Sequence, residues 1–297
     1  ISGAILSVAS WPWLFAVNLP FGVLTFFLAR RYLPGNPTRV EGRRFDFPSA
    51  VLNALTFGLF IGCVEAFSHG LSFRWIVAGV VLLAGIGTVF VRRQLRQPYP
   101  MLPFDLLRIP VFSLSVLTSI LSFTSQMLGM VALPFMFHLT FGMNAAETGL
   151  LMSAWALVIV VVGPLARTLT TIIHPGLLGG VGLLLMSVGC FLLADVSPSV
   201  GYGGLVARLM LCGFGFGLFQ SPNNHLLLSS APSYRTGGAS GMQATARLVG
   251  QTTGAALVAL LFYLNGDRAP HAAMWLAGGF TLCGSLVSCS RLRAHRL

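Results

Sequence analysis

Long apolar runs separated by short polar segments make up most of this sequence. Each run is close to the roughly 20 residues that an α-helix needs to cross the ~30 Å hydrocarbon layer of a membrane. The pattern predicts nine membrane-spanning helices, at residues 12–30, 47–67, 75–91, 111–138, 146–166, 176–194, 202–228, 238–264 and 271–290. A shorter run at 1–10 predicts the tail of a further span. Because the chain opens with Ile1 partway through this run, we expect an N-terminally truncated fragment.

One segment between two predicted spans is too short and too rich in proline to cross a membrane. It reads PYPMLPFDLLRIP and occupies residues 98–110. Apolar and charged residues are mixed in it, which is typical of segments that lie in the membrane interface. We therefore expect an amphipathic piece at the membrane surface, just before the span at 111–138.

The composition indicates that lipid rather than water surrounds the chain. Apolar residues make up 55% of the sequence and charged residues only 8%, whereas about a quarter of the residues in a soluble domain are charged. So few charges cannot cover the surface of a water-soluble protein of 297 residues. The predicted fold class is therefore all-α, a polytopic bundle of transmembrane helices.

The net charge of +11 is distributed by membrane side. No lysine is present, and 14 of the 18 arginines lie in loops or in the tail on one predicted side, against two on the other. Short positively charged loops stay in the cytoplasm, so we expect a cytoplasmic C-terminus. The same asymmetry argues that the basic charge sets the topology, and we expect no binding of nucleic acid.

The sequence lacks the patterns of common catalytic and cofactor sites. Without lysine it contains no phosphate-binding loop of the G-x-x-x-x-G-K-[ST] type. The seven acidic residues and six histidines are scattered, and the five cysteines form no C-x-x-C pair. We therefore expect no enzyme activity, no metal site and no cofactor.

Polar side chains inside the predicted spans are the candidate functional residues. Residues 213–228 read GFGFGLFQSPNNHLLL, so amides interrupt an otherwise apolar span. Such groups are costly in lipid and usually face a cavity or a partner helix. The candidate substrate-pathway residues are Gln126, Gln220, Asn223, Asn224, Arg247 and Gln251.

Two of these residues lie at matching depths on consecutive antiparallel spans. Counted from the cytoplasmic ends of their helices, Gln220 and Arg247 are both at about 12–15 Å. We therefore predict that they share one polar cavity or face each other across one interface. Two interpretations remain open. The amides and Arg247 bond only to one another between packed helices, or they line a solvated translocation cavity.

Prolines and paired glycines within the spans suggest bending and close packing. Pro222 removes a backbone hydrogen bond in the middle of a predicted helix, and Pro20 is expected to act similarly. Glycines four residues apart let helices approach closely in lipid. Close packing alone accounts for them, and helices that slide or rock against one another would also use them. The candidate structural and gating residues are Pro20, Pro222, Gly213, Gly217, Gly250 and Gly254.

Several motifs together resemble one transporter family. The stretch WPWLFAVNLPFG from Trp11 to Gly22 is similar to the W-x-W-x-F-x-x-N-x-P-x-G sequence of the fourteen-span drug:proton antiporters of the EmrB/QacA type, within the major facilitator superfamily. Pro12 stands where a basic residue is common in that family. The pair Phe45–Asp46, the segment 102–112 and the GGASG at 237–241 fit the same pattern. The stretches 220–232 and 245–251 resemble the YebQ-type members in particular.

This resemblance implies a domain organisation for a partial major facilitator fold. Residues 1–46 would end the N-terminal bundle, 47–110 would hold two extra central helices and the surface segment, and 111–297 would form a complete C-terminal six-helix bundle. The family's proton-coupling acid would lie upstream of Ile1. The implied location is the cytoplasmic (inner) membrane of a bacterium.

The resemblance also implies a function and its partners. We expect proton-coupled efflux of drugs or amphiphilic cations by alternating access, with membrane lipid, protons and a small amphiphilic substrate as partners and a monomer as the working unit. A narrow-range exporter of metabolites or organic anions with the same fold, using Arg247 as the counter-charge, is the alternative. A third possibility is that the fragment itself transports nothing, and we expect no transport by residues 1–297 alone.

Overall fold

The protein is a bundle of long apolar helices. The computed structural model describes residues 10, 12–32, 46–68, 72–97, 100, 102–197 and 199–294, and these ranges contain α-helices and short 3-10 helices but no strand. Six of their helical segments are long and apolar enough to cross a membrane, and the last, Ser233–Leu292, contains two successive helices. The predicted all-α transmembrane fold is therefore confirmed. The predicted tail at 1–10 lies outside the described residues except for Ser10.

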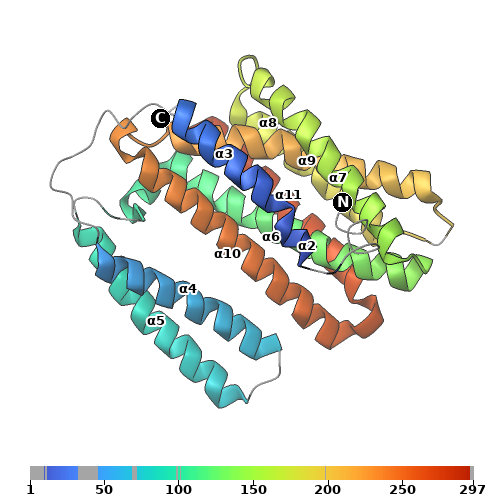
Figure 1. Cartoon of the computed structure of the whole chain (residues 1–297), viewed down its shortest axis with the longest axis horizontal. Helices are drawn as coiled ribbons and strands as arrows, with labels where there is room; N and C mark the ends of the chain where they lie inside the picture. The colour runs from blue at the N-terminus through green and yellow to red at the C-terminus, as the bar shows by residue number, and fades with distance from the viewer. Residues whose placement is uncertain are drawn as a thin grey trace.

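Six helices form the main bundle (Figure 1), and each covers one of the spans predicted from 111–138 onward. Their bounds are α6 Pro110–Phe141, α7 Ala145–Leu169, α8 Pro175–Ala194, α9 Tyr202–Ser229, α10 Thr236–Asn265 and α11 Ala269–Ala294. Helix α9 packs against α7 and α8, α11 packs against α6 and α8, and α10 packs along α6. Helices α9 and α10 contact each other much less than each contacts these neighbours. A core of buried phenylalanine, leucine and methionine side chains lies inside this ring.

Two glycines of α9 set its close approach to α7. A Cβ atom on Gly213 would lie 2.5 Å from the carbonyl oxygen of Trp155, and one on Gly217 would lie 3.0 Å from the Cβ of Val162. No larger side chain fits at the first of these positions without moving the backbone of the neighbouring helix. In lipid, where apolar surface gains little from leaving the solvent, such backbone-to-backbone packing holds helices together.

Helix α10 approaches α6 by the same device. A Cβ atom on Gly250 would lie 2.6 Å from the carbonyl oxygen of Ile120, and one on Gly254 would lie 2.6 Å from that of Thr124. The four glycines singled out in the sequence therefore serve two separate helix contacts. One contact joins α9 to α7 and the other joins α10 to α6.

The predicted span at 12–30 is divided into two helices. Helix α2 covers Trp13–Ala16 and α3 covers Asn18–Tyr32, with Val17 between them. Pro20 has no N–H group to donate to the carbonyl of Ala16, and its ring crowds that carbonyl. Pro20 therefore lies in the first turn of α3 and accounts for the break at Val17, directly after Ala16. No described side chain of α3 is buried, and Figure 1 shows this helix crossing in front of the bundle.

Helices α4 (Phe47–Ser68) and α5 (Phe73–Arg96) form a pair beside the bundle, and α4 touches α10. They correspond to the predicted spans 47–67 and 75–91. At one end of the pair Arg93 contacts Asp46 at 3.1 Å. Hydrogen bonds from Ser49, with further bonds from Gln97 and Arg93, lower the pKa of Asp46 to about 2. The carboxylate therefore stays ionised and ties the start of α4 to the end of α5 at any physiological pH.

Two short 3-10 helices meet beside the start of α10. Helix η1 (Phe104–Arg108) precedes α6, and η2 (Ser233–Arg235) precedes α10. Arg235 donates two hydrogen bonds to the carboxylate of Asp105. The described part of the predicted surface segment also packs inward, because Leu102 and Leu106 are buried against side chains of α6, α9 and α10. The start of α10 is thus held to the segment that leads into α6.

We predict that Gly250→Ala destabilises the protein by about 1–3 kcal/mol, because the new methyl group collides with the backbone of α6. Thermal unfolding of the purified protein in detergent, followed by circular dichroism, measures the loss. Gly237→Ala is the matched control, since it lies in the same helix with no atom within 4 Å of its Cβ position. Equal stability of the two variants would contradict the proposed contact.

We predict that Asp105→Asn lowers stability by up to about 1 kcal/mol at pH 7, since the ion pair is only partly shielded from solvent. Hydrogen bonds from Arg235 hold the pKa of Asp105 below its ordinary value of 3.8. The contribution is therefore complete above that value and is lost as the pH falls through the lowered pKa. The double variant Asp105→Arg with Arg235→Asp should recover part of the loss at pH 7. A difference between wild type and Asp105→Asn that persists at the acid limit would refute this assignment.

Candidate functional site

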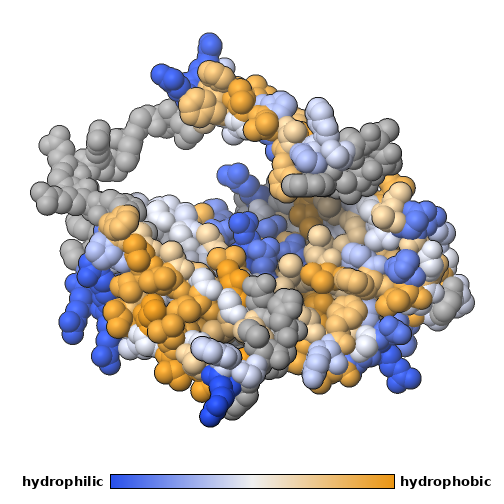
Figure 2. Space-filling view, turned by 60° about the horizontal axis from the view of Figure 1, so that its bottom comes forward, coloured by the Kyte–Doolittle hydropathy of each residue, from blue (hydrophilic) through white to orange (hydrophobic). Residues whose placement is uncertain are grey.

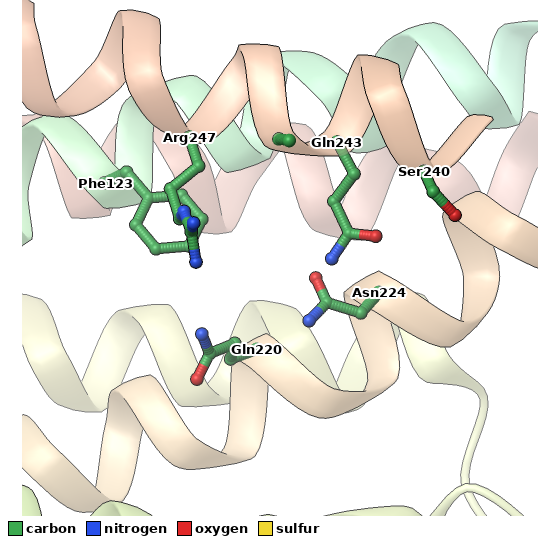
Figure 3. Close-up of a pocket in the computed structure, with 7 residues that line it drawn as sticks. Phe123, Gln220, Asn224, Ser240, Gln243 and Arg247 are labelled. Atoms are coloured by element: carbon green, nitrogen blue, oxygen red, sulfur yellow. The ribbon is translucent and has the colours of Figure 1, made fainter. Parts of the chain in front are cut away.

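A polar cavity of about 230 Å³ lies between α6, α9 and α10 (Figure 3). Its walls combine amide, hydroxyl and guanidinium groups with a nearly equal share of apolar surface. Its lining residues are Phe123, Gln220, Asn224, Ser240, Gln243, Ala244 and Arg247. All three helices belong to segments long and apolar enough to cross a membrane, so this cavity places polar groups where lipid cannot satisfy them.

Helical periodicity explains why these residues meet. Gln220 and Asn224 are four residues apart on α9 and therefore share one face of that helix. The lining residues of α10 occupy positions 240, 243, 244 and 247, the spacing of a single helical face. The two faces confront each other where α9 and α10 diverge.

The side chains point into the space between the two helices. Figure 3 shows the amides of Asn224 and Gln243 directed toward one another, and Gln220 and Arg247 directed inward from opposite walls. The space-filling view in Figure 2 shows hydrophilic residues gathered in a recess between apolar surfaces. This arrangement favours the second interpretation of the sequence, in which the polar groups line a solvated cavity.

Arg247 supplies the formal charge of this lining. Its side chain is exposed, and no described carboxylate forms an ion pair with it. Asp46 pairs with Arg93 and Asp105 pairs with Arg235, both away from the cavity lining, and Glu147 closes the N-terminal capping box of α7 with Asn144. Within the part of the chain that the structure describes, the cavity therefore carries a positive charge with no acidic partner.

Aromatic rings form a rigid apolar floor next to the polar wall. Phe123 of α6 lines the cavity, and its ring packs edge to face against Phe216 of α9, with 5.7 Å between the ring centres. Phe216 in turn contacts Phe219 at 6.2 Å. Both α9 rings are buried. The cavity thus offers one flat apolar surface beside several hydrogen-bonding groups, which suits a small amphiphilic ligand.

Three of the six predicted pathway residues line the cavity, namely Gln220, Asn224 and Arg247. Asn223 is 2% exposed and turns away, donating from its Nδ2 atom to the hydroxyl of Ser119 on α6 at 2.8 Å. Gln126 and Gln251 are half-buried and lie outside the lining. Pro222, buried within α9 between Gln220 and Asn224, leaves the carbonyl of residue 218 without its usual partner inside the helix.

Four lining residues were not among the predicted pathway residues. They are Phe123, Ser240, Gln243 and Ala244. Ser240 and Gln243 precede Arg247 by seven and four positions, so extending the Arg247 face toward the cytoplasmic end of its span would have found them. Nothing in the sequence distinguishes Phe123 or Ala244 from other apolar residues of their spans. No group of three or more metal-ligating side chains occurs among the described residues.

We predict that Ser119→Ala lowers stability by about 1–3 kcal/mol, because it removes the described partner of the Asn223 amide and leaves that buried amide unsatisfied. Ser115→Ala is the matched control. Ser115 is also buried on α6, but its hydroxyl bonds only to the carbonyl of Val111 one turn earlier in the same helix. Thermal unfolding in detergent compares the two, and an equal loss would show that the pair with Asn223 contributes nothing.

Comparison with known proteins places the chain among transporters. The family model of the major facilitator superfamily matches residues 1–255 and 116–295. The chain is 49% identical over 296 residues to the Uncharacterized transporter YebQ of Escherichia coli strain K12. It is 27% identical to the Multidrug efflux pump LfrA of Mycolicibacterium smegmatis over 88% of this chain, and 29% identical to the Cephamycin export protein CmcT of Amycolatopsis lactamdurans over 87%.

These relatives are longer than the present chain. The alignments span 65% of YebQ, 52% of LfrA and 54% of CmcT. The family match extends over nearly all of the 297 residues, and it agrees with the multi-pass helical bundle. The chain belongs to the major facilitator superfamily of membrane transporters.

Proposed function

We propose that this protein exports small amphiphilic molecules from the bacterial cytoplasm by alternating access, with the polar cavity as part of the substrate pathway. The observation that carries the proposal is the cavity itself, which lies among membrane-length helices and is lined by Gln220, Asn224, Gln243 and Arg247. Relatives named for multidrug efflux and for cephamycin export support outward transport.

The physical argument concerns the cost of exposing polar groups to hydrocarbon. A guanidinium group and three amides within membrane-spanning helices are stable only where water, substrate or partner groups reach them. The described structure gives Arg247 no acidic partner. A cavity that fills with water and then with substrate satisfies this requirement.

We further propose that export is driven by protons and that the proton binds outside this lining. Arginine keeps its charge at all physiological pH values, and the remaining lining side chains are amides, a hydroxyl and apolar groups. The resemblance to the fourteen-span drug:proton antiporters supports the coupling. We also propose that the protein is monomeric, lies in the inner membrane and has its C-terminus in the cytoplasm.

The glycine contacts and Pro222 fit the movements that alternating access needs. Pro222 removes a hydrogen bond from α9 beside two lining residues, and the glycines of α9 carry no side chain that would block its movement along α7. We propose that α9 bends at Pro222 while Gly213, Gly217, Gly250 and Gly254 keep the helix contacts narrow.

We predict that Asn224→Leu reduces export at least about tenfold, because it places a hydrocarbon side chain in the polar wall opposite Gln243. Efflux of amphiphilic fluorescent dyes of both charge signs is measured in cells that express the full-length protein, with and without a protonophore. Loss of efflux with the protonophore is expected for the wild type.

The matched control for this experiment is His225→Leu. His225 is the next residue on α9 and is exposed outside the cavity, so its replacement should leave efflux unchanged. The amount of each variant in the membrane is measured alongside. Export by Asn224→Leu at the wild-type rate would contradict the proposed substrate pathway. Wild-type efflux that is unchanged by the protonophore would contradict the proposed proton coupling.

A further inference from the structure

The cavity carries a charge of one sign only. Arg247 is its charged lining residue, and the other polar members are two glutamines, an asparagine and a serine, all neutral. The described carboxylates lie elsewhere, at helix ends and in connecting segments, where Asp46 and Asp105 already pair with arginines. A ligand that enters this part of the protein therefore meets a net positive charge.

The sign of that charge selects among ligands. A guanidinium group in a cavity between membrane-spanning helices attracts an anion and repels a cation, and both effects are stronger than in bulk water because the surrounding protein and lipid screen charge less than water does. The cation-attracting devices that would reverse this preference are a carboxylate or the open face of an aromatic ring. No described carboxylate lines the cavity, and Phe123 is its one aromatic lining residue. The full positive charge of Arg247 therefore outweighs the weak attraction that a single phenyl ring has for a cation.

The hydrogen-bonding inventory points the same way. Arg247 offers only donors, and its planar group matches the two oxygens of a carboxylate. The amides of Gln220, Asn224 and Gln243 can each turn a further donor toward the same oxygens, and Figure 3 shows all three directed into the space that Arg247 enters. Donors from two facing helices thus converge where an acceptor would sit.

We propose that the cavity binds an amphiphilic anion, with a carboxylate or a similar acidic group against Arg247 and an apolar ring system against Phe123. This inference rests on the proposed export function and specifies its substrate class. It replaces the amphiphilic cation expected from the sequence, because that expectation came from the family resemblance rather than from the residues of the cavity. The rival occupant of Arg247 is a carboxylate of the protein itself from outside the described residues, which would neutralise the site.

The test is equilibrium binding by isothermal titration calorimetry to the full-length protein in an uncharged detergent. Two probes share one skeleton and differ in charge, namely 2-naphthylacetate and (2-naphthylmethyl)trimethylammonium, and empty detergent micelles serve as the blank. We expect the carboxylate to bind at least about tenfold more tightly than the ammonium compound, as a charge-assisted hydrogen bond provides.

Two matched variants locate the effect. Arg247→Gln removes the cavity charge, and it should bring the carboxylate down to the affinity of the ammonium compound. Arg167→Gln makes the same charge change at an exposed position near the end of α7, outside the cavity, and should retain the wild-type preference. If Arg247→Gln fails to fold, the comparison of the two probes on the wild type still decides the ligand charge.

Three outcomes would overturn the proposal. They are tighter or equal binding of the ammonium compound, an undiminished carboxylate preference in Arg247→Gln, and no binding of the carboxylate at all, which is the result expected if the protein's own carboxylate occupies Arg247. None of these measurements needs a proton gradient. Failure of the export function appears separately, as the absence of dye efflux from cells that express the wild type, and failure of the proton coupling appears as efflux that the protonophore does not affect.

Discussion

The inability of hydrocarbon to form hydrogen bonds governs this structure at every level. It requires helices, because a single segment can satisfy its own backbone hydrogen bonds in lipid only as a helix. It also requires the buried hydroxyl groups to find acceptors within the protein. Ser115, Thr118 and Ser119 each return their hydroxyl to a carbonyl of α6 one turn earlier. Asn223 finds a partner on the neighbouring helix. Gln220 and Asn224 of α9 and Gln243 and Arg247 of α10 instead face the cavity.

The cavity is a consequence of where the glycines lie. Gly213 and Gly217 draw α9 toward α7, while Gly250 and Gly254 draw α10 toward α6. The two helices that carry the polar faces are therefore each committed to a different neighbour and touch one another only lightly. The close contacts of α9 with α7 and of α10 with α6 leave α9 and α10 free to diverge from each other, and the cavity lies where they diverge.

The sequence predicted the helices and the meeting of Gln220 with Arg247, because apolar length and depth along a span are properties of one chain segment. It did not predict which neighbours of these residues share the cavity. Asn223 is adjacent to Asn224 but lies about 100° further around the helix, and only packing determines that it faces Ser119. Gln251 lies one turn after Arg247 on α10. Because α9 runs in the opposite direction, the matching position on α9 is one turn before Gln220, and the residue there is the buried Phe216. The polar lining therefore ends at this level. The break at Val17, in contrast, follows from Pro20 alone.

The bridge between Asp105 and Arg235 has a mechanical consequence. Helix α10 is fastened to α6 along its length by Gly250 and Gly254, and its first turn is fastened through η2 and η1 to the chain that enters α6. A rod attached to another at two separated points cannot pivot against it. We therefore infer that α6 and α10 move as one unit in the proposed transport cycle. The space around Arg247 then widens from the side of α9, together with α7 and α8, which both pack against α9.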